Sequence, residues 1–400
     1  MSVNLQDLIL VYDGSVKRVW RPAGDDGTYW FEFTDDYSVF DWGKMPDTIA
    51  NKGKALAALG AFFFQHLADN KTWIKLQESS HLLKFNQDWL RKLFNQSSFN
   101  RLTTHGARHH FQGLVTADGA TTTIEQIPAH QTFMSVAKAE VERPQATSIL
   151  DQTVFYYTNN ITDVRKLVPL EVVFRFGMPA GSSLKERLKA DPAYAQTLGL
   201  SAVPEDGQWF ERPVLEFYTK LEPKDRLLSI QEALTISGLA PARFEELTEM
   251  AFVTALAIYH HFAERGIELW DGKFEFLQDH KGLLLADSIG PDELRLVFSG
   301  HSLSKEMIRE FYRGSSWQKA IAKAQKMAAQ ENRLDWQKIC IDDLGEQPDN
   351  LSPQFKAVAD KLYGVLANHT IGYSIFEKHP TLPQFIDSIG LAAQEEGRTK

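Results

Sequence analysis

Apolar and polar residues alternate along the first part of the chain in a way that predicts strands. Residues 8–20, LILVYDGSVKRVW, predict two short strands around a turn at Asp13-Gly14, and the aromatic segment 28–42 continues in the same style. GLVTADGATTTIEQI (113–127) predicts a hairpin with its turn at Asp118-Gly119. The run 166–183 predicts a further strand followed by a loop of small residues.

A 3.6-residue period predicts helices elsewhere. It is clear in 51–70 and in 241–266, where the helix is expected to end at Gly266. From Ser304 the chain is predicted to be helical to its C-terminus, with breaks around 344–353 and 379–383. Strands dominate the first part and helices flank the later strands, which indicates an α+β fold with two lobes and a helical tail.

The stretch DGKFEFLQDHKGLLLAD, residues 271–287, predicts a hairpin with an unusual amount of charge. Asp271, Lys273 and Glu275 alternate with glycine and phenylalanine, so their side chains should share one face of a strand. The partner strand is aliphatic and ends at Asp287. The aliphatic partner suggests that this charged face is at least partly enclosed.

The length of the hairpin loop decides where Asp287 points. A three-residue loop over 280–282, with Gly282 left-handed, places Glu275 opposite Asp287, whereas a two-residue loop puts Asp287 on the other face. We favour the three-residue loop. Two opposed carboxylates need a neutralising cation, and Mg²⁺ suits such a site because it keeps waters and substrate phosphates as its other ligands. A solvated edge hairpin with Lys273 as counterion is the alternative.

Composition narrows the class of protein. The chain has 400 residues, 43% of them hydrophobic, enough for two or three domains. A net charge of −9 argues against a nucleic-acid scaffold, and the single cysteine, Cys340, excludes an internal disulfide and fits a reducing cytosol. The N-terminus lacks a signal-peptide pattern and no apolar run is long enough to cross a bilayer. We therefore expect a soluble, cytoplasmic protein with no nucleic-acid or membrane partner.

Several shorter motifs could carry chemistry. RFGMPAGSS (175–183) has an arginine at a strand end and a small-residue loop that could hold a phosphate or carboxylate, although a plain turn is the simpler interpretation. GSVK (14–17) is similar to a phosphate-covering loop but is too short to be specific. DSIGPDELR (287–295) gathers Asp292 and Arg295 just past the hairpin.

The histidines and the cysteine receive structural interpretations. His105, His109 and His110 lack a carboxylate at a familiar ligand spacing, so we predict a surface loop there rather than a metal site. His260 and His261, at a helix end, are expected to cap the helix or pack in the core. Cys340 is expected to be a buried structural thiol.

Eight motifs in order resemble the phosphoribosylaminoimidazole-succinocarboxamide (SAICAR) synthetase family. They are YDGSVKRVW, FTDDYSVFD, NKGKAL, LVPLEVVFRFGMPAGS, FYTKLEPKD, DGKFEF, LADSIGPDELR and SKEMIREFYR. The resemblance covers about 1–70 and 160–315. It implies a β-rich N-terminal nucleotide-binding lobe (1–165) with an insertion at about 72–150, an ATP-grasp-like α/β catalytic lobe (166–313) and a helical C-terminal extension (314–400).

The resemblance also implies a reaction. The family joins L-aspartate to carboxyaminoimidazole ribotide, with ATP and Mg²⁺, through an acyl-phosphate intermediate that yields SAICAR, ADP and phosphate in purine biosynthesis. The partners implied are these small molecules and, by expectation, a second copy of the chain in a homo-oligomer. Such a site needs many cations around its substrates and a few carboxylates for the metal.

The resemblance carries over to single positions of this sequence. Lys17 lies over the nucleotide phosphates, Glu275 and Asp287 are Mg-ATP ligands, and Lys273 lies near the nucleotide as a catalytic cation. Arg175 and Ser182 hold the ribotide, and Arg295 meets its phosphate. The remaining candidates are Asp225, an acidic residue near the metal or amine site, the loop residues Ser38, Asp41 and Lys52 of the substrate cleft, and the arginines Arg309 and Arg313.

The chain departs from the family pattern at four places. Ser15, Ser288 and Lys224 replace a common lysine, glutamate and histidine, and four residues rather than three separate Arg175 from Ala180-Gly181-Ser182. These departures leave two alternatives open. One is a related ATP-dependent ligase acting on another carboxylate–amine pair, and the other is a catalytically silent nucleotide-binding module. The core charges are present, so we favour an active ligase.

Overall fold

The computed structural model describes residues 7–122, 126–128, 130–158, 164–331, 333 and 335–395. The chain forms two compact units that interleave along the sequence: unit 1 takes its described residues from Met1–Phe62, Gln112–Val136 and Phe298–Lys400, and unit 2 from Phe63–Phe111 and Ala137–Val297. The units do not coincide with the predicted lobes, which were drawn as continuous stretches. Residues 123–125 of the predicted hairpin and 396–400 of the predicted extension lie outside the described residues.

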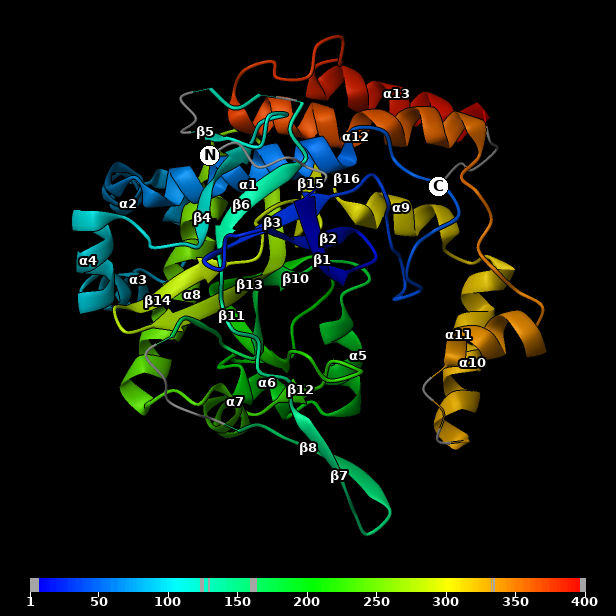
Figure 1. Ribbon diagram of the computed structural model, residues 1–400. Coiled ribbons are helices and arrows are strands. Elements are labelled where there is room, and N and C mark those ends of the chain that lie inside the picture. The colour runs from blue at the N-terminus through cyan, green and yellow to red at the C-terminus, as the bar shows by residue number, and fades with distance from the viewer. Residues whose placement is uncertain are drawn as a thin grey trace. The chain divides into compact units, whose positions relative to one another are not determined.

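Unit 1 is built on a sheet with strand order β1-β2-β3-β6-β4-β5. Its strands are β1 Leu8–Asp13, β2 Lys17–Pro22, β3 Thr28–Phe33, β4 Phe111–Val115, β5 Thr121–Thr122, β6 Phe133–Ala137 and the short β16 His301–Ser302, the first residue of β4 and the last of β6 falling in unit 2. Its helices are α1 Lys52–Ala68, which ends in unit 2, α9 Lys305–Tyr312, α10 Ser316–Gln330, α11 Trp336–Lys338, η3 Ile339–Asp343, α12 Pro353–Ile371 and α13 Leu382–Glu395. Figure 1 shows α12 and α13 side by side.

The sequence predicts much of unit 1. The strands around Asp13-Gly14 are confirmed: Asp13 lies opposite Arg18 across the turn, and the amide of Gly14 donates a hydrogen bond to the Lys17 carbonyl. The predicted hairpin at Asp118-Gly119 appears as β4 and β5. The helical tail and both of its breaks are confirmed, and Cys340 is fully buried. No helix among the described residues is long and apolar enough to cross a membrane.

Unit 2 has a central sheet with strand order β12-β11-β10-β13-β15, and β14 and β9 also pair with β13. Its strands are β7 Gln145–Ile149, β8 Gln152–Tyr156, β9 Lys166–Leu167, β10 Leu170–Met178, β11 Gln208–Thr219, β12 Leu227–Leu228, β13 Glu268–Asp279, β14 Gly282–Ala286 and β15 Leu294–Phe298. Its helices are α2 Asn70–Gln77, η2 Ser80–Leu82, α3 Gln87–Phe94, α4 Ser97–His105, α5 Ser183–Ala190, α6 Tyr194–Thr197, α7 Ile230–Ser237 and α8 Pro241–Ala263.

The two faces of the central sheet differ in chemistry because side chains alternate along each strand. On β10, the residues Leu170, Val172, Phe174 and Phe176 are all fully buried and apolar. The Phe176 ring lies 4.9 Å from that of Tyr259 on α8, so this face is the one that packs on the helix. The residues between them, which include charged ones, point to the opposite face.

The hairpin of β13 and β14 corrects the predicted register. Asp279 pairs with Gly282 and Glu275 pairs with Ala286, so the loop has two residues, His280 and Lys281, rather than three. Glu275 and Asp287 are therefore not opposed, and the prediction that they face each other is wrong. Gly282, at φ 119°, does adopt the positive φ that was expected, but as the first residue of the strand.

Much of the segment predicted as an insertion, about 72–150, packs on other elements of the unit to which it belongs. In unit 2, α2 and α4 lie against α8, and Trp89 of α3 meets Phe252 of α8 edge to face with ring centroids 5.3 Å apart. The β7–β8 hairpin that follows extends away from the remainder of unit 2 (Figure 1), and Leu150 at its tip is 93% exposed.

We expect Phe174→Ala to lower the free energy of unfolding by about 3–5 kcal/mol, because it opens a cavity in a well-packed core. The Phe174 ring is fully buried and stacks on Phe274 with centroids 4.8 Å apart. Leu150→Ala, a truncation at the exposed hairpin tip, should change stability by less than about 0.5 kcal/mol. Urea unfolding of both variants tests this, and equal losses would contradict the assignment of the core.

Candidate active site

The polar face of the central sheet in unit 2 carries a cluster of two lysines and two glutamates. Lys273 Nζ lies 2.5 Å from Glu171 Oε1. Lys220 Nζ lies 2.8 Å from Glu171 Oε1 and 2.7 Å from Glu275 Oε1, and Lys273 is 3.8 Å from that same atom of Glu275. We name Glu171, Lys220, Lys273 and Glu275 the lysine–glutamate cluster. Its formal charges cancel, although its side chains are largely withdrawn from water.

Glu171, Lys220 and Lys273 are held in their ionised forms by their partners in the cluster. Burial by itself would raise the pKa of Glu171, but the two lysines outweigh it and the pKa is lowered. Burial by itself would lower the pKa of Lys220 and of Lys273, yet the two glutamates raise the pKa of each above its ordinary value. The shifts of Glu171, Lys220 and Lys273 all favour their charged forms at neutral pH.

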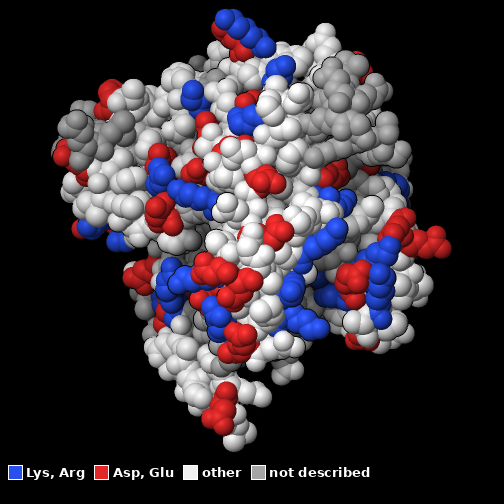
Figure 2. Space-filling model, turned by 90° about the vertical axis from the view of Figure 1, so that its right-hand side faces the viewer, with Lys and Arg blue, Asp and Glu red and all other residues white. Residues whose placement is uncertain are grey.

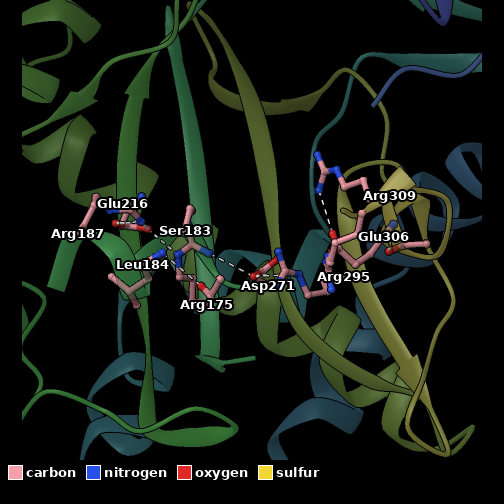
Figure 3. Close-up of polar contacts among 12 residues, drawn as sticks. Arg175, Ser183, Leu184, Arg187, Glu216, Asp271, Arg295, Glu306 and Arg309 are labelled. Atoms are coloured by element: carbon pink, nitrogen blue, oxygen red, sulfur yellow. Dashed lines mark hydrogen bonds and ion pairs between the residues drawn. The ribbon is translucent and has the colours of Figure 1, made fainter. Parts of the chain in front are cut away.

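A second group of charges lies further along the same strands. Arg175 Nε donates to Glu216 Oε2 at 2.5 Å, and Arg175 Nη1 lies 3.2 Å from Asp271 Oδ2. Arg295 Nε lies 3.5 Å from that oxygen of Asp271 (Figure 3). We name Arg175, Glu216, Asp271 and Arg295 the arginine cluster. Arg187 from α5 adds a further contact to Glu216 at 2.7 Å.

Sheet register brings this second cluster together. Arg175 of β10 and Arg295 of β15 both lie directly opposite Asp271 of β13. Burial by itself would raise the pKa of Glu216, but Arg175 and Arg187 outweigh it and lower the pKa, so this fully buried carboxylate stays ionised.

One atom of the arginine cluster lacks a partner. Arg295 Nη1 is buried and has no hydrogen-bond partner within the described part of the chain. Buried guanidinium nitrogens are nearly always bonded, so such an atom calls for an explanation.

Ser182 begins the helix beside the arginine cluster. It is buried, and its hydroxyl oxygen accepts a hydrogen bond from the Leu184 amide at 3.3 Å, which caps α5. Its neighbour Ser183 lies 3.5 Å from Arg175 Nη2. Beyond Arg175 the pairing of β10 with β11 shifts register, and Pro213, which has no N–H for the ladder, lies in the shifted stretch. The additional residue between Arg175 and Ala180-Gly181-Ser182 thus comes after the point where the pairing of β10 with β11 shifts register.

Asp287 sits just beyond β14 in a left-handed backbone conformation, with φ 60°. Its carbonyl oxygen accepts a hydrogen bond from His110 Nε2 at 3.0 Å, which requires the tautomer with a proton on Nε2. His110 is buried, because residues 108–110 bond to Leu285 of β14 through backbone groups. The predicted surface loop is therefore wrong: His110 is buried, His109 is half-buried, and His105, although exposed, is the last residue of α4. His261 is buried, in agreement with its predicted core role.

Four of the six predicted site residues of unit 1 lie in three places. Lys17 of β2 holds its Nζ 4.4 Å from the centroid of the Phe31 ring. Ser38 and Asp41 lie in the loop between β3 and α1, and Asp41 is exposed. Lys52, the first residue of α1, is 1% exposed and lies 5.4 Å from the ring centroid of Tyr363.

The remaining predicted site residues are Arg309, Arg313 and Asp225. Arg309 and Arg313 both bond to Glu306 of α9, at 3.1 and 2.7 Å. Asp225 lies exposed in the turn between β11 and β12 of unit 2. Apart from those drawn together in the two clusters, the site residues keep only the roles that the resemblance implies.

Sequence reasoning missed Lys220, Glu171 and Glu216 as members of the site, and it placed Asp271 on the charged face of the strand without giving it a role. Glu171 and Glu216 each lie between two apolar residues of a strand, which was the signal available for them. Lys220 follows the end of β11 and gave no local signal.

The carboxylates of unit 2 fit Mg²⁺ only if substrate phosphates and waters supply its other ligands. No three His, Cys, Asp or Glu residues in the described part of the chain are grouped so that they could hold a metal ion. Glu275 and Asp287 offer hard oxygen donors, which Mg²⁺ accepts one or two at a time when substrate phosphates and waters complete its shell. The donor set therefore fits a metal that arrives with a phosphate rather than an all-protein cage.

Charges outside the site behave differently. Over much of the face in Figure 2, acidic and basic side chains lie next to one another. Exposed pairs such as Lys189 with Glu186 contribute little to stability, since water screens them. The lysine–glutamate and arginine clusters, by contrast, are largely enclosed.

Comparison with known proteins identifies one family. The model of the family described as SAICAR synthetase matches residues 10–324. A relative from Archaeoglobus fulgidus, whose name assigns it provisionally as a phosphoribosylaminoimidazole-succinocarboxamide synthase, is 31% identical over 94% of this chain and 98% of its own length. The phosphoribosylaminoimidazole-succinocarboxamide synthase of Thermoplasma volcanium is 28% identical over 76% of this chain and 83% of its own. A solved SAICAR synthase from Saccharomyces cerevisiae, complexed with SAICAR, shares the fold at 20% identity and a TM-score of 0.55, covering 94% of this chain and 98% of that one.

We expect Glu216→Gln to lower the free energy of unfolding at pH 7 by about 3–5 kcal/mol, because it leaves the buried Arg175 and the partly buried Arg187 short of a carboxylate. The pKa of Glu216 in the folded protein lies below its ordinary value of 4.5. The ionised carboxylate therefore stabilises the fold in full above pH 4.5, and this stabilisation is lost as the pH falls through the folded pKa. The gap between variant and wild type should therefore shrink on acidification below about pH 4.5.

Urea unfolding at several pH values measures the gap. Glu186→Gln, the same change in an exposed pair, is the matched control and should leave the pH dependence as in the wild type. A gap that stays constant from pH 7 to pH 3 would show that the Glu216 charge is not what stabilises the fold.

Proposed function

This chain belongs to the SAICAR synthetase family, and from that premise we propose which of its residues carry each part of the reaction. It is an ATP-dependent carbon–nitrogen ligase of purine biosynthesis that joins L-aspartate to carboxyaminoimidazole ribotide, giving SAICAR, ADP and phosphate. Its cytoplasmic location and its assembly into a homo-oligomer stay predictions.

The chemistry explains why the reaction needs ATP. A carboxylate is a poor acyl donor because its oxygens do not leave. Transfer of the γ-phosphoryl group to a carboxylate oxygen of the ribotide forms an acyl phosphate and ADP. The amine of aspartate then attacks the acyl carbon, the C–O bond to phosphate breaks, and the amide forms with loss of a proton. Catalysis rests mainly on positioning and on stabilising charge.

The lysine–glutamate cluster is our candidate for the Mg-ATP half of this reaction, and it is the observation that carries the proposal. Lys273 and Lys220 can turn from their carboxylate partners to phosphate oxygens, since an ammonium group has three donors. Glu275 and Asp287 would hold Mg²⁺, which supplies charge neutralisation at the transferring phosphoryl group. The alternation of strand faces does not separate the two, because β14 ends at Ala286 and the left-handed backbone of Asp287 turns its side chain out of that pattern. Lys17 stays a predicted contact of the nucleotide phosphates.

The arginine cluster is our candidate for the ribotide. Arg295 Nη1, buried and without a hydrogen-bond partner among the described residues, would gain one from a phosphate oxygen of the ribotide. Ser182 caps α5 beside it, where backbone amides at a helix start add affinity for an anion. Arg175 is held too firmly by Glu216 and Asp271 to be a mobile ligand, so we assign it to orienting that pocket.

We expect ADP release to require both the ribotide and L-aspartate. A coupled ADP assay with each substrate left out in turn measures this. ATP turnover that is independent of both would overturn the proposed reaction. Activity with another carboxylate but none with the ribotide would instead select a related ligase, and ATP binding without any turnover would select a silent module.

We expect Asp287→Asn to lower kcat by about 100-fold or more, since it removes a charged metal ligand and little packing. Asparagine tolerates the left-handed conformation that Asp287 adopts, so the fold should remain. Asp206→Asn, the same change at an exposed ion pair with Lys185, is the control. Near wild-type turnover of Asp287→Asn, with thermal stability of all three proteins equal, would refute the assigned role.

A further inference from the structure

The loop between β3 and α1, residues 34–51, contains three non-glycine residues in the left-handed backbone region. Their φ angles are 55° at Phe40, 57° at Asp41 and 61° at Asn51. A side chain with a Cβ is strained in that region, and such strain persists only where surrounding contacts hold it. The same loop carries Ser38 and Asp41, two of the predicted substrate residues.

Aromatic side chains from the C-terminal part of unit 1 hold the first half of the loop. The Trp42 ring meets Trp317 of α10 edge to face, with centroids 5.4 Å apart, and Trp336 of α11 at 5.8 Å. Phe40 lies 5.8 Å from Trp317. Trp317 Nε1 is buried and has no hydrogen-bond partner within the described residues, so Trp317 acts here by packing alone.

Hydrogen bonds from the same C-terminal part hold the second half. Asp47 accepts from the Leu351 amide at 3.0 Å and, within the loop, from the Tyr37 hydroxyl at 2.5 Å. Asp360 of α12 accepts from the Ala50 amide at 2.7 Å. The loop is thus tied at both ends to residues more than 250 positions later in the chain.

Two contacts reach the predicted substrate residues themselves. Gln337 Nε2 donates to the carbonyl oxygen of Asp41 at 3.4 Å. The buried Lys52 ammonium lies over the ring of Tyr363 in α12. The backbone of one candidate and the side chain of another are therefore held by this C-terminal segment.

We propose that residues 316–363 are a positioning element that holds the 34–51 loop in its substrate-binding conformation and thereby sets the affinity for the carboxylate-bearing substrates. The inference rests on the proposed function and on the family resemblance, which implies that Ser38 and Asp41 line the substrate cleft. It gives a role to the predicted C-terminal extension, most of which lies beyond residue 324, where the match to the family model ends.

Trp336→Ala tests the proposal with little risk to the fold, because Trp336 is partly exposed and touches the loop through Trp42. Trp336→Phe restores an aromatic ring at that position. Trp89→Ala is the matched control, because Trp89 is also partly exposed and meets Phe252 edge to face in unit 2. Kinetics with each substrate varied, hydrogen exchange of peptides from 34–51, and thermal stability are measured on the full chain.

The expected result is a rise of about two- to tenfold in KM for the ribotide, for aspartate or for both, the size set by one aromatic pair. The KM for ATP should not change, and Trp336→Phe should recover most of the loss. Hydrogen exchange should become faster in 34–51 and stay unchanged in 268–287. Trp89→Ala should leave all three KM values and exchange in 34–51 as in the wild type.

Three outcomes would overturn the inference: unchanged KM values in Trp336→Ala, an equal change in Trp89→Ala, or a general loss of stability with every KM affected. Failure of the proposed function is a separate result. It would appear as wild-type protein that makes no SAICAR, whereas hydrogen exchange in 34–51 still decides whether the segment holds the loop.

Discussion

Neutralisation of buried charge is the constraint on which the arrangement of unit 2 depends. Its central sheet packs one face on α8, and on the other it holds four carboxylates, those of Glu171, Glu216, Asp271 and Glu275. A carboxylate withdrawn from water costs several kcal/mol unless a cation and hydrogen bonds compensate it. Each of the four has a lysine or arginine within 3.5 Å. The strand register that makes those pairs also fixes where substrates could bind.

The pairing of these carboxylates with lysines and arginines affects how an amide ligase can bind substrates that carry phosphate groups. ATP and the ribotide both bring phosphate groups, and the cations that would meet them already have carboxylate partners. An entering phosphate therefore exchanges one anionic partner for another, which avoids the presence of a bare buried cation in the resting protein. A carboxylate released in the same exchange is a hard oxygen donor of the kind Mg²⁺ prefers. In the proposed assignment, stability and substrate binding thus draw on the same charges.

Prediction from sequence worked where the signal was local. The alternation in DGKFEF placed Asp271, Lys273 and Glu275 on one face, and that face proved to be charged and largely enclosed. It failed for the loop of that hairpin, because two- and three-residue loops differ by one residue and both fit the sequence HKG. Lys220 was missed because the residues it contacts are 49 and 55 positions away.

The sequence by itself determined the alternation that divides each strand into an apolar and a charged face, the helices of regular period, and the family motifs, since each of these is written in neighbouring residues. Only the tertiary structure decided which charges meet. Arg175 finds Glu216 and Asp271 through strand pairing across 41 and 96 positions, and His110 reaches the carbonyl of Asp287 across 177. Likewise, only the fold ties the strained 34–51 loop to the C-terminal helices. The physical reason is that a buried charge or a strained backbone is stabilised by whatever packs against it, and packing partners are set by the chain as a whole.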